Sequence, residues 1–198
     1  YILLRYEENK YSNNPDELKK KINTEDIENK TLWTDQTDNK LDAVMTNANW
    51  KDKYIEFNGE TTYGILDKIN TKAITIETTI LCTKLPEDND ECIIGDIQND
   101  TELLYITKGG YIKAKLKIGE NEYEVTSTQK LEENKVYGIT LTYDGKNLII
   151  YINGKEEVKI EIKDGKQFFD NKLELIIGAK SNKKAETDSN KDEKGSAE

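Results

Sequence analysis

The chain has 198 residues, of which 35% are hydrophobic and 34% are charged. Its 39 acidic and 29 basic side chains give a formal net charge of −10 at pH 7, which argues against nucleic acid and against an anionic membrane surface as partners, because both need a basic patch. The sequence contains no His, so Ser–His and Cys–His catalytic arrangements and imidazole zinc sites are excluded.

Length and hydropathy indicate one sizeable core and no membrane span. A chain of this size can bury most of its unfolded surface, and no apolar run approaches the roughly 18–20 residues that a span requires. The N-terminus has no basic stretch followed by an apolar core, so no signal peptide is expected. The first residue is Tyr, which we interpret as a segment of a longer polypeptide that contains other domains.

The N-terminal part begins with an apolar stretch and then turns polar. "YILLRYE" predicts an initial strand, and residues 8–31 predict a polar loop insertion. Within it, "NNPDELKKKI" has an Asn cap, a Pro at the first helical position and acids in the first turn. This pattern predicts a short exposed helix.

From residue 54 onward, apolar and polar residues alternate with period two, and turn signals separate the runs. The clearest run, "YIKAKLKI", places Ile112, Ala114, Leu116 and Ile118 on one face and three lysines on the other. Similar alternation predicts strands in "KAITIETTIL", "ELLYIT", "YGITLTY", "VKIEIK" and "LELII". A shift of one residue would turn each apolar set to water, so the register is well specified.

Two Gly-containing dipeptides, Asp144-Gly145 and Asn153-Gly154, lie on either side of one apolar run. A two-residue type I′ turn needs positive φ at both central positions, which these dipeptides tolerate. The stretch 142–160 is therefore predicted to be a three-stranded antiparallel meander.

Eight to ten short strands with few helical periods predict an all-β fold, a two-sheet antiparallel jelly-roll sandwich over residues 1–179. Residues 180–198 contain no apolar side chain larger than Ala, and we expect a disordered polar tail or a truncated loop there. Cys82 and Cys92 flank a polar loop, and the alternatives of a disulfide bond and of two free buried thiols both stay open.

The order of these pieces resembles the concanavalin A-like lectin/glucanase superfamily, in particular its laminin G-like and pentraxin-like branch of bacterial surface and phage-tail proteins. The pieces that carry the resemblance are "LWTDQTDNKLDAVMTNANW", "YIEFNGETTYGIL", "AITIETTI", "IIGDIQNDTELLYIT", "VYGITLTYDGKNLIIYINGK" and "LELIIGA". They cover roughly residues 1–6 and 32–179. The resemblance implies a lectin-like sandwich with its chemistry on the rims.

Two departures from that pattern concern the last strand and calcium. Relatives carry a final strand after the equivalent of residue 179, and here nothing strand-like follows, so we expect either a truncated segment or an open sheet edge beside "YILLRYE". The resemblance places calcium on two loops, at Asn99 and Asp100 and after Ala179. Asn99 and Asp100 suit a hard cation, but Lys180, Ser181 and Asn182 occupy the second loop, so a simple turn at Asn99-Asp100 is the favoured interpretation.

A glucanase would place two or three carboxylates on one inner strand, because acid and nucleophile flank one glycosidic bond. The densest carboxylate set, "PEDNDE" at 86–91, follows a Pro in a loop, where strand spacing is lost. Charge runs usually belong to solvated loops. The sequence therefore predicts a protein that is not an enzyme.

Sugar-binding modules combine an aromatic platform with a few fixed polar groups. Tyr63, Tyr105 and Tyr111 are expected on or beside loops, and Tyr105 with Asp100 and its neighbour Asn99 is the first choice for ligand contact. Trp33 and Trp50 are expected to pack in the core. The lysine stripe 113–117 suggests an anionic glycan, but pairing with glutamates on the next strand is the favoured account.

Two functional hypotheses follow. The first is a non-catalytic module that binds a polysaccharide or cell-surface glycan, within a larger extracellular, cell-surface or virion-associated bacterial protein. The second is a structural spacer or protein-interaction domain without a small ligand. Because one fold hosts many functions, both rest largely on the resemblance.

Overall fold

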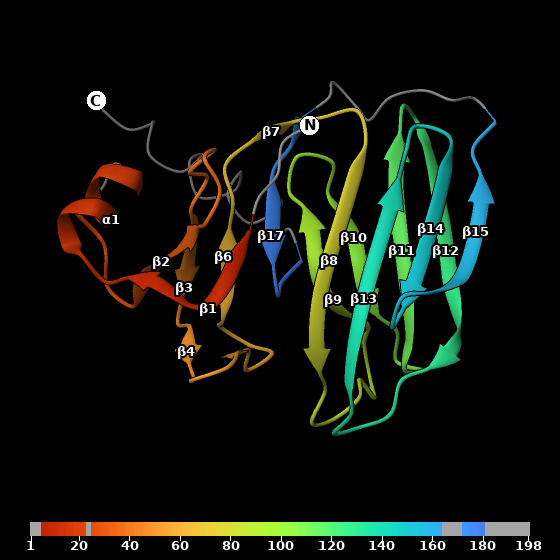
Figure 1. The fold of residues 1–198 in the computed structure, drawn as a ribbon, viewed down its shortest axis with the longest axis horizontal. Helices are drawn as coiled ribbons and strands as arrows, with labels where there is room; N and C mark the ends of the chain where they lie inside the picture. Colours follow the sequence, from red (N-terminus) through yellow and green to blue (C-terminus); the bar gives the residue numbers. More distant parts are fainter. Residues whose placement is uncertain (1–4, 23–24, 164–171, 181–198) are drawn as a thin grey trace, which may run out of the picture.

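The computed structural model describes residues 5–22, 25–163 and 172–180, and these residues form mainly antiparallel strands (Figure 1). Among them, a single helix, α1 (Pro15–Ile22), follows the first strand. The strands in chain order are β1 (Tyr6–Ser12), β2 (Lys30–Asp35), β3 (Ala43–Thr46), β4 (Asn49–Trp50), β5 (Ile55–Glu56), β6 (Tyr63–Ile65), β7 (Ile69–Asn70), β8 (Ile74–Leu81), β9 (Glu91–Asp96), β10 (Thr101–Ile106), β11 (Tyr111–Ile118), β12 (Asn121–Lys130), β13 (Val136–Tyr143), β14 (Asn147–Ile152), β15 (Lys155–Glu161), β16 (Lys172–Leu173) and β17 (Leu175–Ile177).

The strands form two stacked sheets. A nine-stranded sheet has the order β1-β2-β3-β6-β17-β9-β10-β11-β12, and a four-stranded sheet has the order β15-β14-β13-β8. The four-stranded sheet covers the β9–β12 half of the larger sheet, whereas β1, β2, β3 and α1 extend away from it (Figure 1). Two short pairs, β16-β7 and β4-β5, complete the fold. The predicted two-sheet antiparallel sandwich is confirmed.

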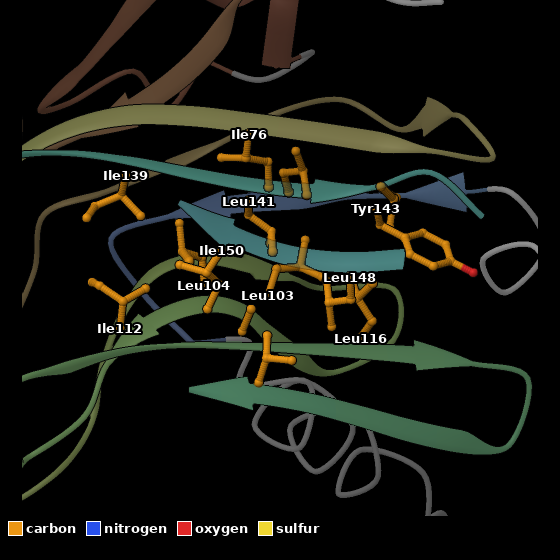
Figure 2. Close-up of a cluster of buried hydrophobic side chains, with 14 of the residues drawn as sticks. Ile76, Leu103, Leu104, Ile112, Leu116, Ile139, Leu141, Tyr143, Leu148 and Ile150 are labelled. Atoms are coloured by element: carbon orange, nitrogen blue, oxygen red, sulfur yellow. The ribbon is translucent and has the colours of Figure 1, made fainter. Parts of the chain in front are cut away.

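The core lies between the two sheets, where the alternating apolar residues meet (Figure 2). Ile112, Ala114 and Leu116 of β11 have no exposed side-chain surface, and neither do Leu141 of β13 and Ile150 of β14. Fully burying one such aliphatic side chain stabilises the fold by about 1.5–3 kcal/mol. The apolar and polar faces predicted for these strands are the ones observed.

The two Gly-containing turns of the meander differ in type. Asn153 and Gly154 have φ values of 51° and 76° and join β14 directly to β15, as a type I′ turn requires. At the other turn only Gly145 has a positive φ, of 96°, so the predicted type I′ turn at Asp144-Gly145 is wrong. There the Asp144 carboxylate accepts hydrogen bonds from the backbone N–H groups of Lys146 (2.8 Å) and Asn147 (2.6 Å), which fixes a longer turn.

The N-terminal part contains more strand than the sequence predicts. β1 continues to Ser12 and β2 begins at Lys30, so the predicted loop insertion 8–31 is partly strand. The predicted helix is present, and the side chain of Asn14 accepts a hydrogen bond from Asp16 N at 3.0 Å, as expected of a cap. The helix packs against the sheet through Leu18, which is 2% exposed.

The closing segment and the cysteines bear on two alternatives that the sequence leaves open, and the structure decides the one that concerns the cysteines. The predicted strand 173–177 is divided into β16 and β17, and β17 lies between β6 and β9. Among the described residues, β1 is an edge strand that pairs only with β2. Cys82 and Cys92 are free thiols, and burial raises the pKa of Cys92 to about 12. The predicted tail lies almost entirely outside the described residues, which end at Lys180.

Candidate functional site

Asn99 and Asp100 lie in the turn between β9 and β10. Asp100 is exposed and adopts a left-handed conformation with φ of 52°. The Asn99 amide donates a hydrogen bond to the carboxylate of Asp96, which is only 1% exposed. Asp96 also accepts from Gln98 N (3.0 Å) and from Glu174 N (3.3 Å). The side chain of Asn99 therefore holds this turn together, in line with the turn interpretation.

The second loop that the resemblance assigns to calcium contacts strand β10 through Lys180. The Lys180 ammonium lies 2.9 Å from the Glu102 carboxylate. A calcium site would need an oxygen ligand at this position of the loop, and an ammonium group cannot supply one. Within the described ranges, no three His, Cys, Asp or Glu side chains are grouped so that they could hold a metal ion. Ser181 and Asn182 lie outside these ranges.

Tyr105 is not beside a loop, contrary to the sequence-based expectation. It lies within β10 between Cys92 of β9 and Lys113 of β11, and only 5% of it is exposed. The Lys113 ammonium lies 5.8 Å from the centre of its ring, and burial raises the pKa of its hydroxyl. The ring therefore contributes to packing, and little of its surface is available for ligand contact.

Tyr63 and Tyr111 lie apart from each other and from Asn99-Asp100. Tyr111 begins β11 and is 36% exposed, and it lies at the opposite end of β10 from the turn that contains Asn99 and Asp100. Tyr63 is half-buried at the start of β6, on the far side of β17 and β9. The five residues predicted from the sequence do not form one site.

Two of the three lysines in the stripe on β11, Lys113 and Lys115, are paired with glutamates of β12. Lys113 lies 2.6 Å from the Glu124 carboxylate, and Lys115 lies 3.1 Å from Glu124 and 3.7 Å from Glu122. Cross-strand pairing therefore accounts for the charges of Lys113 and Lys115, as favoured from the sequence.

A different set of residues gathers on the part of the large sheet that the small sheet leaves uncovered. Tyr6, Tyr11, Trp33 and Trp50 form an aromatic cluster. The rings of Tyr11 and Trp50 stack with centres 4.3 Å apart and planes at 14°, and Trp33 meets Trp50 edge-on at 6.0 Å. Tyr6 lies 5.2 Å from Trp33. Both tryptophans are half-buried and pack against the core, so their predicted core position is only partly right.

Both indole N–H groups of the cluster are used inside the protein. Trp33 Nε1 donates to the backbone oxygen of Glu7 at 2.8 Å, and Trp50 Nε1 donates to Thr31 Oγ1 at 3.1 Å. These bonds fix the orientation of both rings. What the tryptophans offer to other molecules is therefore ring surface, without an N–H donor.

The hairpin β4–β5 adds a hollow beside this cluster. Lys51 N donates to Tyr54 O at 2.9 Å, which closes a tight turn between the two strands. The hollow has a volume of about 440 Å³ and is lined by Trp50, Lys51, Asp52, Lys53 and Tyr54. The hollow is wide open to solvent, so it offers a surface on which a ligand could lie and does not enclose one. Tyr54 is 57% exposed and Tyr11 is 42% exposed, so aromatic surface faces solvent here.

The charges of the hairpin compensate one another. The Glu56 carboxylate accepts a hydrogen bond from Asn49 Nδ2 at 2.6 Å and lies 3.5 Å from the Lys51 ammonium. Residues 49–56 thus contain two lysines and two carboxylates and carry no formal net charge. An aromatic hollow of this kind can bind a small molecule with an apolar face.

Solved structures with the same fold include binding domains of clostridial toxins. The binding domain of Paraclostridial Mosquitocidal Protein 1 is 18% identical, with a TM-score of 0.61 over 75% of this chain and 42% of that one. The ligand-binding domain of botulinum neurotoxin serotype D, in complex with N-acetylneuraminic acid, is 18% identical, with a TM-score of 0.59 over 73% and 39%. The binding domain of botulinum neurotoxin DC, in complex with rat synaptotagmin II, is 16% identical, with a TM-score of 0.55 over 75% and 41%. These likenesses establish the fold alone, and the chain spans less than half of each structure.

No curated protein matches the chain in sequence. A family model, Laminin_G_3, described as the concanavalin A-like lectin/glucanases superfamily, matches residues 32–193, which is most of the sequence. The strand order and the core described above agree with that match. The chain belongs to the concanavalin A-like lectin/glucanases superfamily.

Proposed function

We propose that this chain is a non-catalytic carbohydrate-binding module of a larger extracellular, cell-surface or virion-associated bacterial protein. Its sugar platform is formed by Tyr11, Trp50 and Tyr54. The observation that carries the proposal is the hollow of about 440 Å³ bounded by partly exposed aromatic rings. Tyr and Trp rings supply large flat surfaces at low conformational cost, as sugar rings require.

The likeness to toxin binding domains supports a binding role. Structures of that fold were solved with N-acetylneuraminic acid and with a protein receptor bound to the toxin domains. The part of those domains that this chain resembles is less than half of each. A module that acts together with further domains of a parent chain is consistent with that partial coverage.

A non-catalytic role is supported by what the acidic loop 86–91 does. The Asp90 carboxylate accepts a hydrogen bond from Lys108 N at 2.9 Å, and Glu87 pairs with Lys84 at 3.0 Å. These carboxylates stabilise turns near the ends of β8 and β10. Glycoside hydrolysis needs two carboxyl groups that face one bond across the substrate, and these carboxylates are engaged otherwise.

A protein-interaction domain is the second candidate, favoured by one exposed apolar pair. Leu81 of β8 and Val136 of β13 are cross-strand neighbours and are 50% and 61% exposed. β8 is also an edge strand of the four-stranded sheet, and edges invite pairing with another chain.

Glycan-array binding of the 198-residue chain tests the proposal, with Tyr54→Ala and Tyr111→Ala as matched variants. Both tyrosines are exposed, but Tyr111 lies among the residues predicted from the sequence and away from the hollow. We expect saturable glycan binding that Tyr54→Ala weakens at least about tenfold, since aromatic anchors often contribute 2 kcal/mol or more. Tyr111→Ala should retain it. The proposal is contradicted if no glycan on the array binds, or if Tyr111→Ala weakens glycan binding and Tyr54→Ala does not.

A further inference from the structure

We infer that the hollow selects an uncharged pyranose glycan, held by stacking of the C–H face of its sugar rings, over acidic glycans. This inference rests on the proposed function and names the ligand class of the same site. Three observations carry it: the indole N–H donors are used within the protein, the single arginine is already paired, and the charges of the hairpin and of the whole chain disfavour an anion.

The first observation is that the aromatic donors are already occupied. Trp50 Nε1 bonds to Thr31 Oγ1 and Trp33 Nε1 bonds to the Glu7 backbone oxygen. An acidic sugar gains affinity from N–H donors aimed at its carboxylate. The indoles offer none, so the contact with Trp50 is made through ring surface, which suits the apolar C–H face of a sugar.

The second observation is that no guanidinium is available for an acidic group. Arg is the side chain suited to bidentate recognition of carboxylate and phosphate. The chain's single arginine, Arg5, lies 2.6 Å from the Glu7 carboxylate and is thus already paired. The recognition of an acidic sugar would therefore depend on lysines alone.

The third observation is the balance of charge at the hollow. The Lys51 ammonium lies 3.5 Å from the Glu56 carboxylate and is paired with it. The other lysine of the hairpin, Lys53, follows Asp52 in the sequence and has an exposed side chain. A single exposed ammonium in water contributes little, because exposed ion pairs are worth about 0.2–1 kcal/mol. The net charge of −10 repels polyanions further.

Calorimetric titration of the full chain tests the inference with matched sugars. The probes are glucan, galactan and mannan hexaoses and the hexauronates with the same linkages, at about 0.02 M and about 0.5 M salt. We expect at least one neutral hexaose to bind at least about tenfold tighter than its hexauronate, with an affinity that changes less than about twofold between the two salt concentrations. The variant Tyr54→Ala should abolish this affinity, whereas Tyr111→Ala, whose side chain lies away from the hollow, should change it less than about twofold.

The outcomes separate the inference from the proposed function. Tighter binding of hexauronates, or a steep loss of affinity with salt, overturns the inference. If the hexauronates bind and Tyr54→Ala abolishes that binding, the proposed carbohydrate-binding function and its site are still supported. If neither neutral nor acidic sugars bind, the proposed function fails, and the inference fails with it.

Discussion

Asp35, a buried carboxylate at the end of β2, organises the loop that leads to β3. It is 2% exposed, and its oxygens accept from Arg5 N (3.0 Å), Thr37 N (3.0 Å), Thr37 Oγ1 (2.8 Å) and Leu41 N (3.2 Å). Burial alone would raise the pKa of Asp35, but these hydrogen bonds to the charged form outweigh it and lower the pKa. Both carboxylate oxygens of Asp35 accept hydrogen bonds, so a side chain with a donor in place of either oxygen does not fit this loop.

The variant Asp35→Asn should therefore be destabilised. An amide group places a donor where one of the two oxygens now accepts, which leaves at least one buried N–H without an acceptor, at a cost of about 1–3 kcal/mol. Urea denaturation of the variant measures the loss. Asp38→Asn is the control, since Asp38 lies exposed in the same loop. Equal stability of the two variants would contradict the role of Asp35.

Asp144 provides a prediction about pH. Hydrogen bonds from the Asn147 side chain and from the N–H groups of Asn147 and Lys146 lower the pKa of Asp144 to about 2, from an ordinary value of 3.8. A lowered folded-state pKa contributes stability that is present above the unfolded value and lost as pH falls through the folded one. The denaturation midpoints of the unchanged chain and of Asp144→Ala are measured from pH 4 to pH 2. The difference between the two midpoints should become smaller as the pH falls. A constant difference would contradict this account.

At the residue scale, the sequence predicts the candidate site poorly. Residue type indicates that tyrosines and tryptophans are candidates for ligand contact. However, Tyr105 is covered within a strand, and the sequence does not distinguish Tyr11 and Tyr54 from the other tyrosines. Tyr11 reaches Trp50 only because β1 pairs with β2, with an irregular register between Tyr6 and Tyr11. A contact between residues 11 and 50 depends on this strand pairing, which alternation along one segment does not show. The motif "NWKDKY", two aromatics around a short charged turn, was the available signal.

At the element scale, long strands with clean alternation could be predicted, and short ones could not. β8, β11 and β13 have eight residues each, and their buried faces are the ones that the pattern indicates. β4, β5 and β7 have two residues each, too few for a period to be visible. Their pairing is set by neighbouring strands and not by their own composition.

The β4–β5 hairpin, which carries the hollow, is held at both ends. Trp50 is fixed by its bond to Thr31 Oγ1 of β2. Phe57, directly after β5, packs closely over Gly178, where a Cβ atom would lie 2.4 Å from the ring. Gly178 has a φ of 74°, a conformation that favours glycine. The segment after β17 therefore supports the hairpin.

The turn at Asn153-Gly154 gives a prediction for this scale. Gly154→Ala should lower the free energy of unfolding by about 1 kcal/mol, because a side chain is strained in the left-handed region. Gly138→Ala is a matched control on the adjacent strand β13: its φ is not positive, and the nearest atom to an added Cβ is 3.8 Å away. It should be neutral or slightly stabilising. Thermal unfolding of both variants measures the difference, and a larger loss with Gly138→Ala would contradict the turn assignment.

At the scale of the whole molecule, the sandwich is closed on one side and open on the other. The Glu157 carboxylate of β15 accepts from Thr128 Oγ1 (2.7 Å) and Gln129 N (3.0 Å) of β12, which joins the outer strands of the two sheets. On the opposite side the large sheet continues past the small one through β6, β3, β2 and β1 (Figure 1). That extension carries the aromatic cluster and the hollow.

The buried core and the proposed binding surface lie in different parts of the molecule. The core between the sheets supplies the buried aliphatic surface, whereas exposed aromatic rings lie on the extension outside it. Within the described ranges no helix is long and apolar enough to cross a membrane. The proposed binding surface lies on the extension of the large sheet, at one end of the sandwich.

The measurement that tests this account most directly is ¹⁹F NMR of the chain labelled with 5-fluorotryptophan, during titration with the tightest-binding neutral hexaose. The two tryptophans give two resonances, which Trp33→Phe assigns. We predict a saturable shift of the Trp50 resonance, with a smaller change at Trp33, whose edge faces Trp50 at 6.0 Å. A Trp50 resonance that does not move at saturating sugar would contradict the account.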